Sequence, residues 1–201
     1  MSKIDYNLSQ IKGIVFDVDG VLSPSTISLS KDGVPMRMVS VKDGYALQLA
    51  VKQGNKIAII TGADSEAVRV RYALQLAVKM GYKIAIITGA DCDAVKKRLN
   101  ALGIDDIYLK VAVKITCLKS WMEANGFKCE EVAFVGDDVP DYECMNYVGL
   151  SVAPYDAATD IIQIANYISP KKGGEGVARD FLEQLLRNNG QWMSSEKAFG
   201  W

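Results

Sequence analysis

Residues 11–21 read IKGIVFDVDGV, a short apolar run that ends in two aspartates and a glycine. Uninterrupted apolar and β-branched residues are typical of a strand that is buried on both faces, as in a parallel sheet. In such sheets ligands bind at the carboxyl ends of the strands, so we expect a functional loop to begin at Asp17. Asp17 and Asp19 can bind Mg²⁺ or divide the roles of nucleophile and acid. The alternative is a pair of solvated loop aspartates.

Strand and helix patterns alternate along the rest of the chain. We expect strands at 56–61, 83–88, 106–109, 131–135 and 150–153, and helices at 91–102, 113–125 and 176–187. This alternation predicts an α/β fold, a three-layer Rossmann-like arrangement with helices on both faces of a parallel sheet. Asp32-Gly33 between extended runs predicts a β-hairpin within 24–42. We expect a single domain over 1–187 and a polar tail over 188–201.

One 27-residue segment occurs twice in tandem. Residues 45–71 read YALQLAVKQGNKIAIITGADSEAVRVR and residues 72–98 read YALQLAVKMGYKIAIITGADCDAVKKR, with 21 of 27 positions identical. Each copy predicts a helix and then a strand. An apolar stripe over 64–80 favours one continuous helix, so the two copies would form a βαβ unit that adds one strand to the sheet. The alternative, extrusion of one copy, would expose an apolar strand to water. Whether the duplication is natural or engineered stays open.

The composition excludes several classes of protein. The 201 residues contain no histidine, which excludes Ser-His-Asp and Cys-His triads and most catalytic zinc sites. A net charge of −1 indicates no nucleic-acid partner. No apolar run is long enough to span a membrane, and the first residues lack the apolar core of a signal peptide. Four cysteines without a CxxC pair are typical of reduced thiols, so we expect a cytoplasmic protein.

Three further motifs carry candidate site residues. Asp137, Asp138 and Asp141 follow the strand at 131–135, and four acids gathered at one sheet edge would repel each other without a cation. Thr61-Gly62 and Thr88-Gly89 each end a strand and open a helix, where a hydroxyl and free amides bind phosphate. Lys114 begins a helix and could neutralise a phosphate or hold a carboxylate. The alternatives are a capped turn, ordinary helix caps and a surface lysine.

The order of these motifs resembles the haloacid dehalogenase-like phosphohydrolase superfamily. The hairpin, VKDG at 41–44 and GGEGVAR at 173–179 are similar to the 3-deoxy-D-manno-octulosonate (KDO) 8-phosphate phosphatase group and its relatives that act on KDN 9-phosphate. The resemblance implies Mg²⁺-dependent hydrolysis of a small keto-sugar acid phosphate. It also implies a small β-hairpin in place of a cap domain, and a homotetramer.

The resemblance also assigns roles to individual residues. Asp17 would be the nucleophile that forms an aspartyl-phosphate, and Asp19 the general acid and then the base. Mg²⁺ would be held by Asp17, the Asp19 carbonyl and Asp137, with support from Asp138 and Asp141. The phosphoryl group would be bound by Lys114 and one Thr-Gly pair. Candidates for substrate or subunit contacts are Lys171, Lys172, Gly174 and Arg179, whose alternative is a charged surface loop.

The duplication bears on this assignment. Thr61 has the family's spacing from Asp17, whereas Thr88 has the family's spacing to Lys114. An added strand is expected to move Lys114 outward by about 4.8 Å, and a misplacement of about 1 Å can already cost about 100-fold in rate. We therefore expect the duplication to weaken or abolish activity. Two other functions stay open, namely a catalytically silent scaffold or engineered duplication and, less favoured, a phosphorelay receiver domain.

Overall fold

The computed structural model describes residues 3–17, 19–22, 24–26, 28–29, 31, 35–36, 42–43, 46, 49–50, 56–61, 85–88, 106–109, 111 and 113–192. The strands are β1 (Gly13–Phe16), β2 (Ser28–Leu29), β3 (Pro35–Met36), β4 (Lys56–Thr61), β5 (Ala85–Thr88), β6 (Asp106–Leu109), β7 (Val132–Val135), β8 (Leu150–Ala153) and β9 (Tyr167–Ile168). The α-helices are α4 (Lys114–Asn125), α5 (Tyr142–Tyr147), α6 (Thr159–Ile164) and α7 (Val177–Asn188). Single 3₁₀ turns are η1 (Leu8–Gln10), η2 (Cys129–Glu131) and η3 (Val139–Asp141).

The described strands form one parallel sheet and a separate hairpin. The sheet has the strand order β6-β5-β4-β1-β7-β8-β9, and every pair of neighbours is parallel. Each copy of the duplicated segment supplies one strand, because β4 belongs to the first copy and β5 to the second. These strands are neighbours, with Thr61 opposite Thr88. The expectation that the sheet gains a strand is therefore confirmed, and the helix expected over 64–80 lies outside the described residues.

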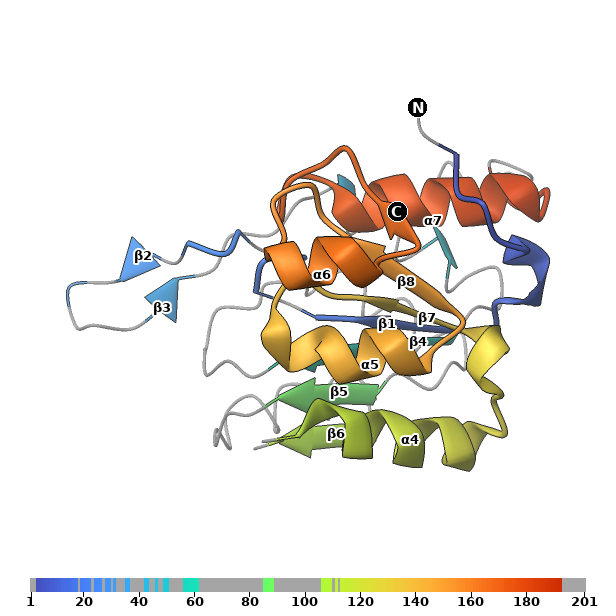
Figure 1. Cartoon of the computed structure of the whole chain (residues 1–201), viewed down its shortest axis with the longest axis horizontal. Helices are drawn as coiled ribbons and strands as arrows, with labels where there is room; N and C mark the ends of the chain where they lie inside the picture. The colour runs from blue at the N-terminus through green and yellow to red at the C-terminus, as the bar shows by residue number, and fades with distance from the viewer. Residues whose placement is uncertain are drawn as a thin grey trace.

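Helices cover both faces of the sheet (Figure 1). Alternate residues of β1 divide between two buried clusters, with Ile14 and Phe16 in one and Val15 in the other. The first cluster includes the apolar face of α7, and the second joins the sheet to α4, α5 and α6. This is the expected three-layer α/β arrangement. Both faces of β1 and β7 are buried, as their uninterrupted apolar sequences predict.

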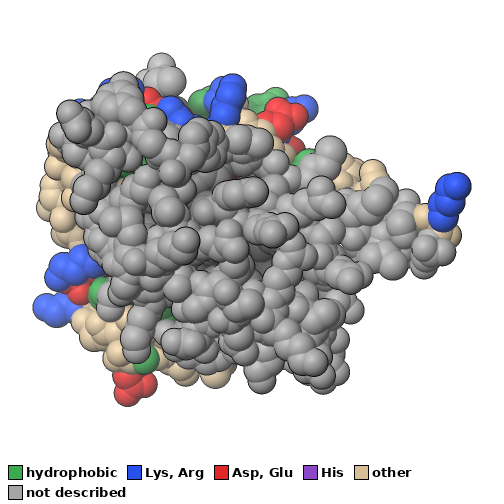
Figure 2. Space-filling view, turned by 180° about the vertical axis from the view of Figure 1, so that it is seen from behind, with side chains coloured by type: hydrophobic (Ala, Val, Ile, Leu, Met, Phe, Trp, Pro, Cys, Tyr) green, Lys and Arg blue, Asp and Glu red, His purple; other side chains and the backbone are tan. Residues whose placement is uncertain are grey.

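The β2–β3 hairpin is antiparallel and projects from the body of the molecule (Figure 1). In the view from behind, blue Lys and Arg side-chain atoms lie at the far end of this projection (Figure 2). The hairpin falls within the expected range of 24–42. Helix α4 is capped at its carboxyl end by Gly126, whose left-handed backbone (φ 67°) suits a residue without a side chain. None of the described helices has the length and apolar character needed to cross a membrane.

Candidate active site

The acidic motifs meet at the carboxyl ends of β1 and β7. These strands are neighbours, with Phe16 opposite Val135, so Asp17 and the Gly136-Asp137 turn leave the sheet side by side. The backbone N–H of Asp17 donates to the Val135 carbonyl at 2.9 Å, which extends the pairing to the first site residue. The predicted convergence of the two motifs is therefore a consequence of parallel pairing.

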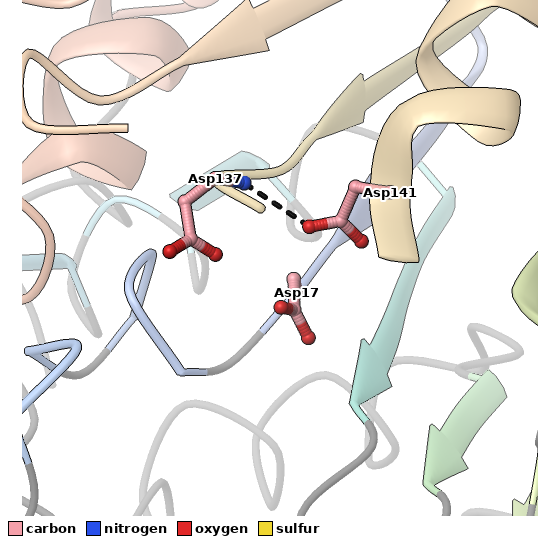
Figure 3. Close-up of side chains that lie close together, drawn as sticks. All are labelled: Asp17, Asp137 and Asp141. Atoms are coloured by element: carbon pink, nitrogen blue, oxygen red, sulfur yellow. Dashed lines mark hydrogen bonds between the residues drawn. The ribbon is translucent and has the colours of Figure 1, made fainter. Parts of the chain in front are cut away.

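Three carboxylates come together at this edge of the sheet. Asp17, Asp137 and Asp141 each offer an oxygen, and these oxygens lie within 4.8 Å of one another. Figure 3 shows Asp17 just beyond β1, Asp137 in the loop after β7 and Asp141 beside it, with an Asp141 oxygen hydrogen-bonded to the Asp137 backbone nitrogen. Such a set of oxygen donors suits a hard divalent cation.

Lys114 neutralises two of the three carboxylates. Its Nζ lies 3.1 Å from Asp17 Oδ1 and 2.7 Å from Asp141 Oδ1, and all three side chains are at least nine-tenths buried. Burial alone would lower the pKa of Lys114, but the charges of Asp17 and Asp141 outweigh it and raise that pKa. Lys114 is thus a permanent cation beside Asp17.

Asp141 organises the turn that carries Asp137. Its Oδ2 accepts hydrogen bonds from the backbone N–H groups of Asp137 at 3.1 Å and Asp138 at 3.4 Å, while its Oδ1 accepts from Lys114. Both Asp141 oxygens therefore already have protein donors. This favours a role in holding Lys114 and the Asp137 backbone over a role as a direct metal ligand.

Of the three carboxylates, that of Asp137 is best suited to bind a cation. Burial, together with the negative charges of Asp141 and Asp138, raises its pKa to about 7. Its Oδ1 is buried and has no hydrogen-bond donor within the part of the chain that the structure describes. A divalent cation would both neutralise this carboxylate and occupy the vacant acceptor. Asp17 and Asp137 are accordingly the side chains that fit Mg²⁺.

The expected outward shift of Lys114 is wrong. The added strand does separate β6 from β4, but Lys114 still lies 3.1 Å from Asp17. The reason is that Lys114 belongs to α4, whose Leu118 and Trp121 pack in the same buried cluster as β1 Val15 and β7 Phe134. Helix α4 therefore packs over the central strands β1 and β7, which keeps Lys114 beside Asp17.

The two threonines lie at different distances from β1 in the sheet. Thr61 ends β4, which pairs directly with β1, whereas Thr88 ends β5, one strand farther out. Their glycines, Gly62 and Gly89, lie outside the described residues.

The other predicted residues have varied surroundings. Asp19 is half-buried, and its charge contributes to the raised pKa of Asp137. Asp138 is exposed, and its Oδ1 accepts from the Val139 N–H at 2.8 Å, so it caps η3. This is the capped turn that we considered as the alternative for the GDD motif.

The candidate residues near the carboxyl end of the chain also differ from one another in exposure and in the groups they contact. Lys171 and Lys172 are exposed, while the Gly174 N–H donates to the Val21 carbonyl at 2.9 Å. Arg179 directs its Nε to Glu183 at 2.9 Å and stacks on Trp192 at 4.4 Å. Through Gly174 the loop therefore reaches the turn that follows the Asp17–Asp19 motif. The Arg179 contacts instead lie along α7 and the Trp192 segment.

Sequence reasoning missed several acidic residues that organise this edge. Asp180 accepts from Tyr167 at 2.7 Å and from Ser169 at 2.8 Å, and Asp156 accepts from the Gly173 N–H at 2.9 Å. Asp43 is buried and accepts from the Arg179 N–H. Asp43 lies within the VKDG motif at 41–44, and Asp180 directly follows the GGEGVAR motif at 173–179. The sequence therefore draws attention to both regions, but only the fold shows what these two side chains contact.

Comparison with known proteins identifies the family. A profile of haloacid dehalogenase-like hydrolases matches residues 103–181. The chain is 31% identical over 181 residues to the 3-deoxy-D-manno-octulosonate 8-phosphate phosphatase KdsC of Escherichia coli K12, covering 90% of this chain and 82% of the relative. The chain belongs to the haloacid dehalogenase-like hydrolases, within the KDO 8-phosphate phosphatase group. The expectation of a phosphatase is thereby confirmed.

Solved structures agree with this membership. The phosphatase of Yersinia pestis has a TM-score of 0.69 and 27% identity, with 92% of this chain and 85% of that chain covered. The Moraxella catarrhalis enzyme, solved with magnesium, phosphate and a KDO molecule, has a TM-score of 0.72 and 25% identity, with coverage of 96% and 95%. The magnesium in that relative supports the Mg²⁺ expected from the acidic motifs.

Proposed function

We propose that this chain hydrolyses the phosphomonoester of a small keto-sugar acid, of the KDO 8-phosphate or KDN 9-phosphate type, with Mg²⁺ as cofactor. The observation that carries the proposal is the buried contact of Lys114 with both Asp17 and Asp141. A buried lysine beside a carboxylate that also faces further acids suits phosphoryl transfer, which requires a positioned nucleophile and compensation of negative charge.

The Asp17 carboxylate is the proposed nucleophile. Its oxygen attacks phosphorus, the new O–P bond forms, and the bond from phosphorus to the sugar oxygen breaks. Asp19 donates a proton to that sugar oxygen and then takes one from the water that cleaves the aspartyl-phosphate. Phosphate is released, and Asp17 and Asp19 return to their starting states. No histidine is needed at any step.

Lys114 supplies a fixed positive charge beside the Asp17 nucleophile, where it can compensate the charge of the phosphoryl group. Asp17, Asp137 and the Asp19 carbonyl would hold Mg²⁺, which would add to this charge compensation when bound. Asp141 keeps Lys114 in place, since its Oδ1 accepts from Nζ at 2.7 Å. Asp138 supports the turn from its exposed cap position.

We further propose that Thr61, and not Thr88, supplies the phosphate-binding hydroxyl. Support comes from the sheet order, because β4 is the neighbour of β1 and Thr61 lies at its carboxyl end. The equivalent position of β5 is one strand farther from Asp17, a difference of about 4.8 Å. The duplication then leaves one complete set of motifs around Asp17, and we propose that the chain is active. Assembly as a homotetramer in the cytoplasm stays a prediction.

The proposal is tested by a substrate panel. We expect Mg²⁺-dependent release of phosphate from KDO 8-phosphate or KDN 9-phosphate, with a kcat/KM roughly 100-fold above that of p-nitrophenyl phosphate, because the sugar acid adds binding energy in the transition state. Asp17→Asn should abolish turnover and prevent beryllofluoride binding. Beryllofluoride binding without turnover of any substrate would favour the receiver domain, and absence of both would favour the silent scaffold.

A further inference from the structure

The loop between β9 and α7 contacts the turn that follows Asp19. The Gly174 N–H donates to the carbonyl of Val21 at 2.9 Å, and the Gly173 N–H donates to Asp156 Oδ1 at the same distance. Asp156 lies in the loop between β8 and α6. Three loops from separate strands therefore meet at Gly173.

Two glycines in this stack leave no room for a side chain. A Cβ at Gly173 would lie 2.1 Å from the Gly20 carbonyl oxygen, well inside any allowed contact. A Cβ at Gly20 would lie 1.8 Å from Asp137 Oδ2. Gly173 thus lies directly against Gly20, and Gly20 lies directly against the Asp137 carboxylate.

The loop is also fixed at the end where it leaves β9. Ser169 donates from its hydroxyl to the buried Asp180 at 2.8 Å and accepts from the Lys171 N–H at 3.2 Å. Tyr167 donates to the same Asp180 oxygen. With this end of the loop held by Asp180, the bond from Gly173 to Asp156 is the side-chain contact that holds Gly173 against Gly20, beside the backbone bond from Gly174 to Val21.

We propose that Asp156 and Gly173 form a clamp that positions the Asp19–Gly20 peptide and the Asp137 carboxylate for binding Mg²⁺. Asp156 is a positioning residue in this scheme, since it acts only through the Gly173 backbone. The inference rests on the proposed function in one respect, that Asp137 and the Asp19 carbonyl are metal ligands. Mg²⁺ requires near-octahedral geometry with short bonds, so a small shift of either ligand weakens binding.

The clamp is tested by Mg²⁺ binding measured calorimetrically on the full chain without substrate. Asp156→Ala should raise the Kd for Mg²⁺ roughly tenfold, in the range found when residues that orient metal ligands are removed. Because Asp156 is exposed, the melting temperature without metal should not change. Asp156→Asn keeps an oxygen that accepts from Gly173 and should bind Mg²⁺ as the unmodified chain does.

Two glycine variants separate the clamp from general destabilisation. Gly173→Ala should raise the Kd about 100-fold. Gly149→Ala is the matched control, because its Cβ would lie 2.2 Å from Tyr6 Oη, at the amino end of β8 and thus away from the site. It should lower the melting temperature and leave the Kd unchanged.

The outcomes distinguish the clamp from the proposed function. Equal Mg²⁺ affinity in the unmodified chain, Asp156→Ala and Gly173→Ala would overturn the clamp and leave the proposed function intact. Binding as weak in Asp156→Asn as in Asp156→Ala would also overturn it, since the charge and not the hydrogen bond would then matter. If the unmodified chain binds no Mg²⁺, both fail.

Discussion

The two sides of β1 contribute to the site in different ways. On one side, β7 and the turn after it place Asp137 and Asp141, and α4 brings Lys114 to within 3.1 Å of Asp17. On the other side, the duplicated segment supplies β4 and β5, two parallel strands that end in paired threonines. A parallel sheet can widen by one strand because each strand satisfies its neighbour's backbone groups. The site residues remain together because they depend on the packing of α4 against β1 and β7.

The largest effect is expected from a change on the β7 side. Lys114→Met leaves Asp17 and Asp141 without their shared cation, so we expect kcat to fall roughly 1,000-fold, the upper range for loss of one electrostatic contact. The measurement is Mg²⁺-dependent phosphate release. Lys119→Met, on an exposed position of the same helix, is the control and should retain normal activity. Equal rates for the two variants would mean that Lys114 only supports the fold.

A second prediction separates the two copies on the β4–β5 side. Thr61→Ala should lower kcat/KM roughly 10- to 100-fold through loss of a hydrogen bond to a charged group, whereas Thr88→Ala should have no effect. The two variants differ only in which copy is altered, so each is the control for the other. A larger loss in Thr88→Ala would reverse the assignment and show that β5 takes the functional position.

The third prediction concerns the electrostatic strain at Asp137. Burial and the neighbouring acids raise its pKa from 3.8 to about 7, so between these values the folded chain binds more protons than the unfolded chain. The free energy of unfolding without metal should therefore fall as the pH rises from 4 to 7 and stay low above it.

Asp137→Asn removes this penalty. In EDTA at pH 8 it should melt several degrees above the unmodified chain, and the difference should shrink at pH 5. Thermal denaturation followed by circular dichroism provides the measurement, with Asp160→Asn on the exposed face of α6 as the control. An unchanged melting temperature at pH 8 would show that Asp137 carries no such penalty.

The sequence predicts the framework well because its signals are local. The apolar run before Asp17 and the alternation of helices and strands are sufficient for the α/β fold and for the meeting of Asp17 with Asp137. The position of Lys114 was predicted wrongly because chain order placed it after β6, whereas its helix packs on β1 and β7. The contacts of Asp156 and Gly173 could not be predicted, since they join loops far apart in sequence.

The most direct test compares the full chain with variants lacking 45–71 or 72–98. We predict that all three have kcat/KM values within about threefold of one another on the same sugar acid phosphate, far from the roughly 100-fold cost of a 1 Å misplacement. Such agreement would show that the added strand widens the sheet without disturbing Asp17, Lys114 and Asp137. A full chain slower than both deletion variants by 100-fold or more would contradict this claim.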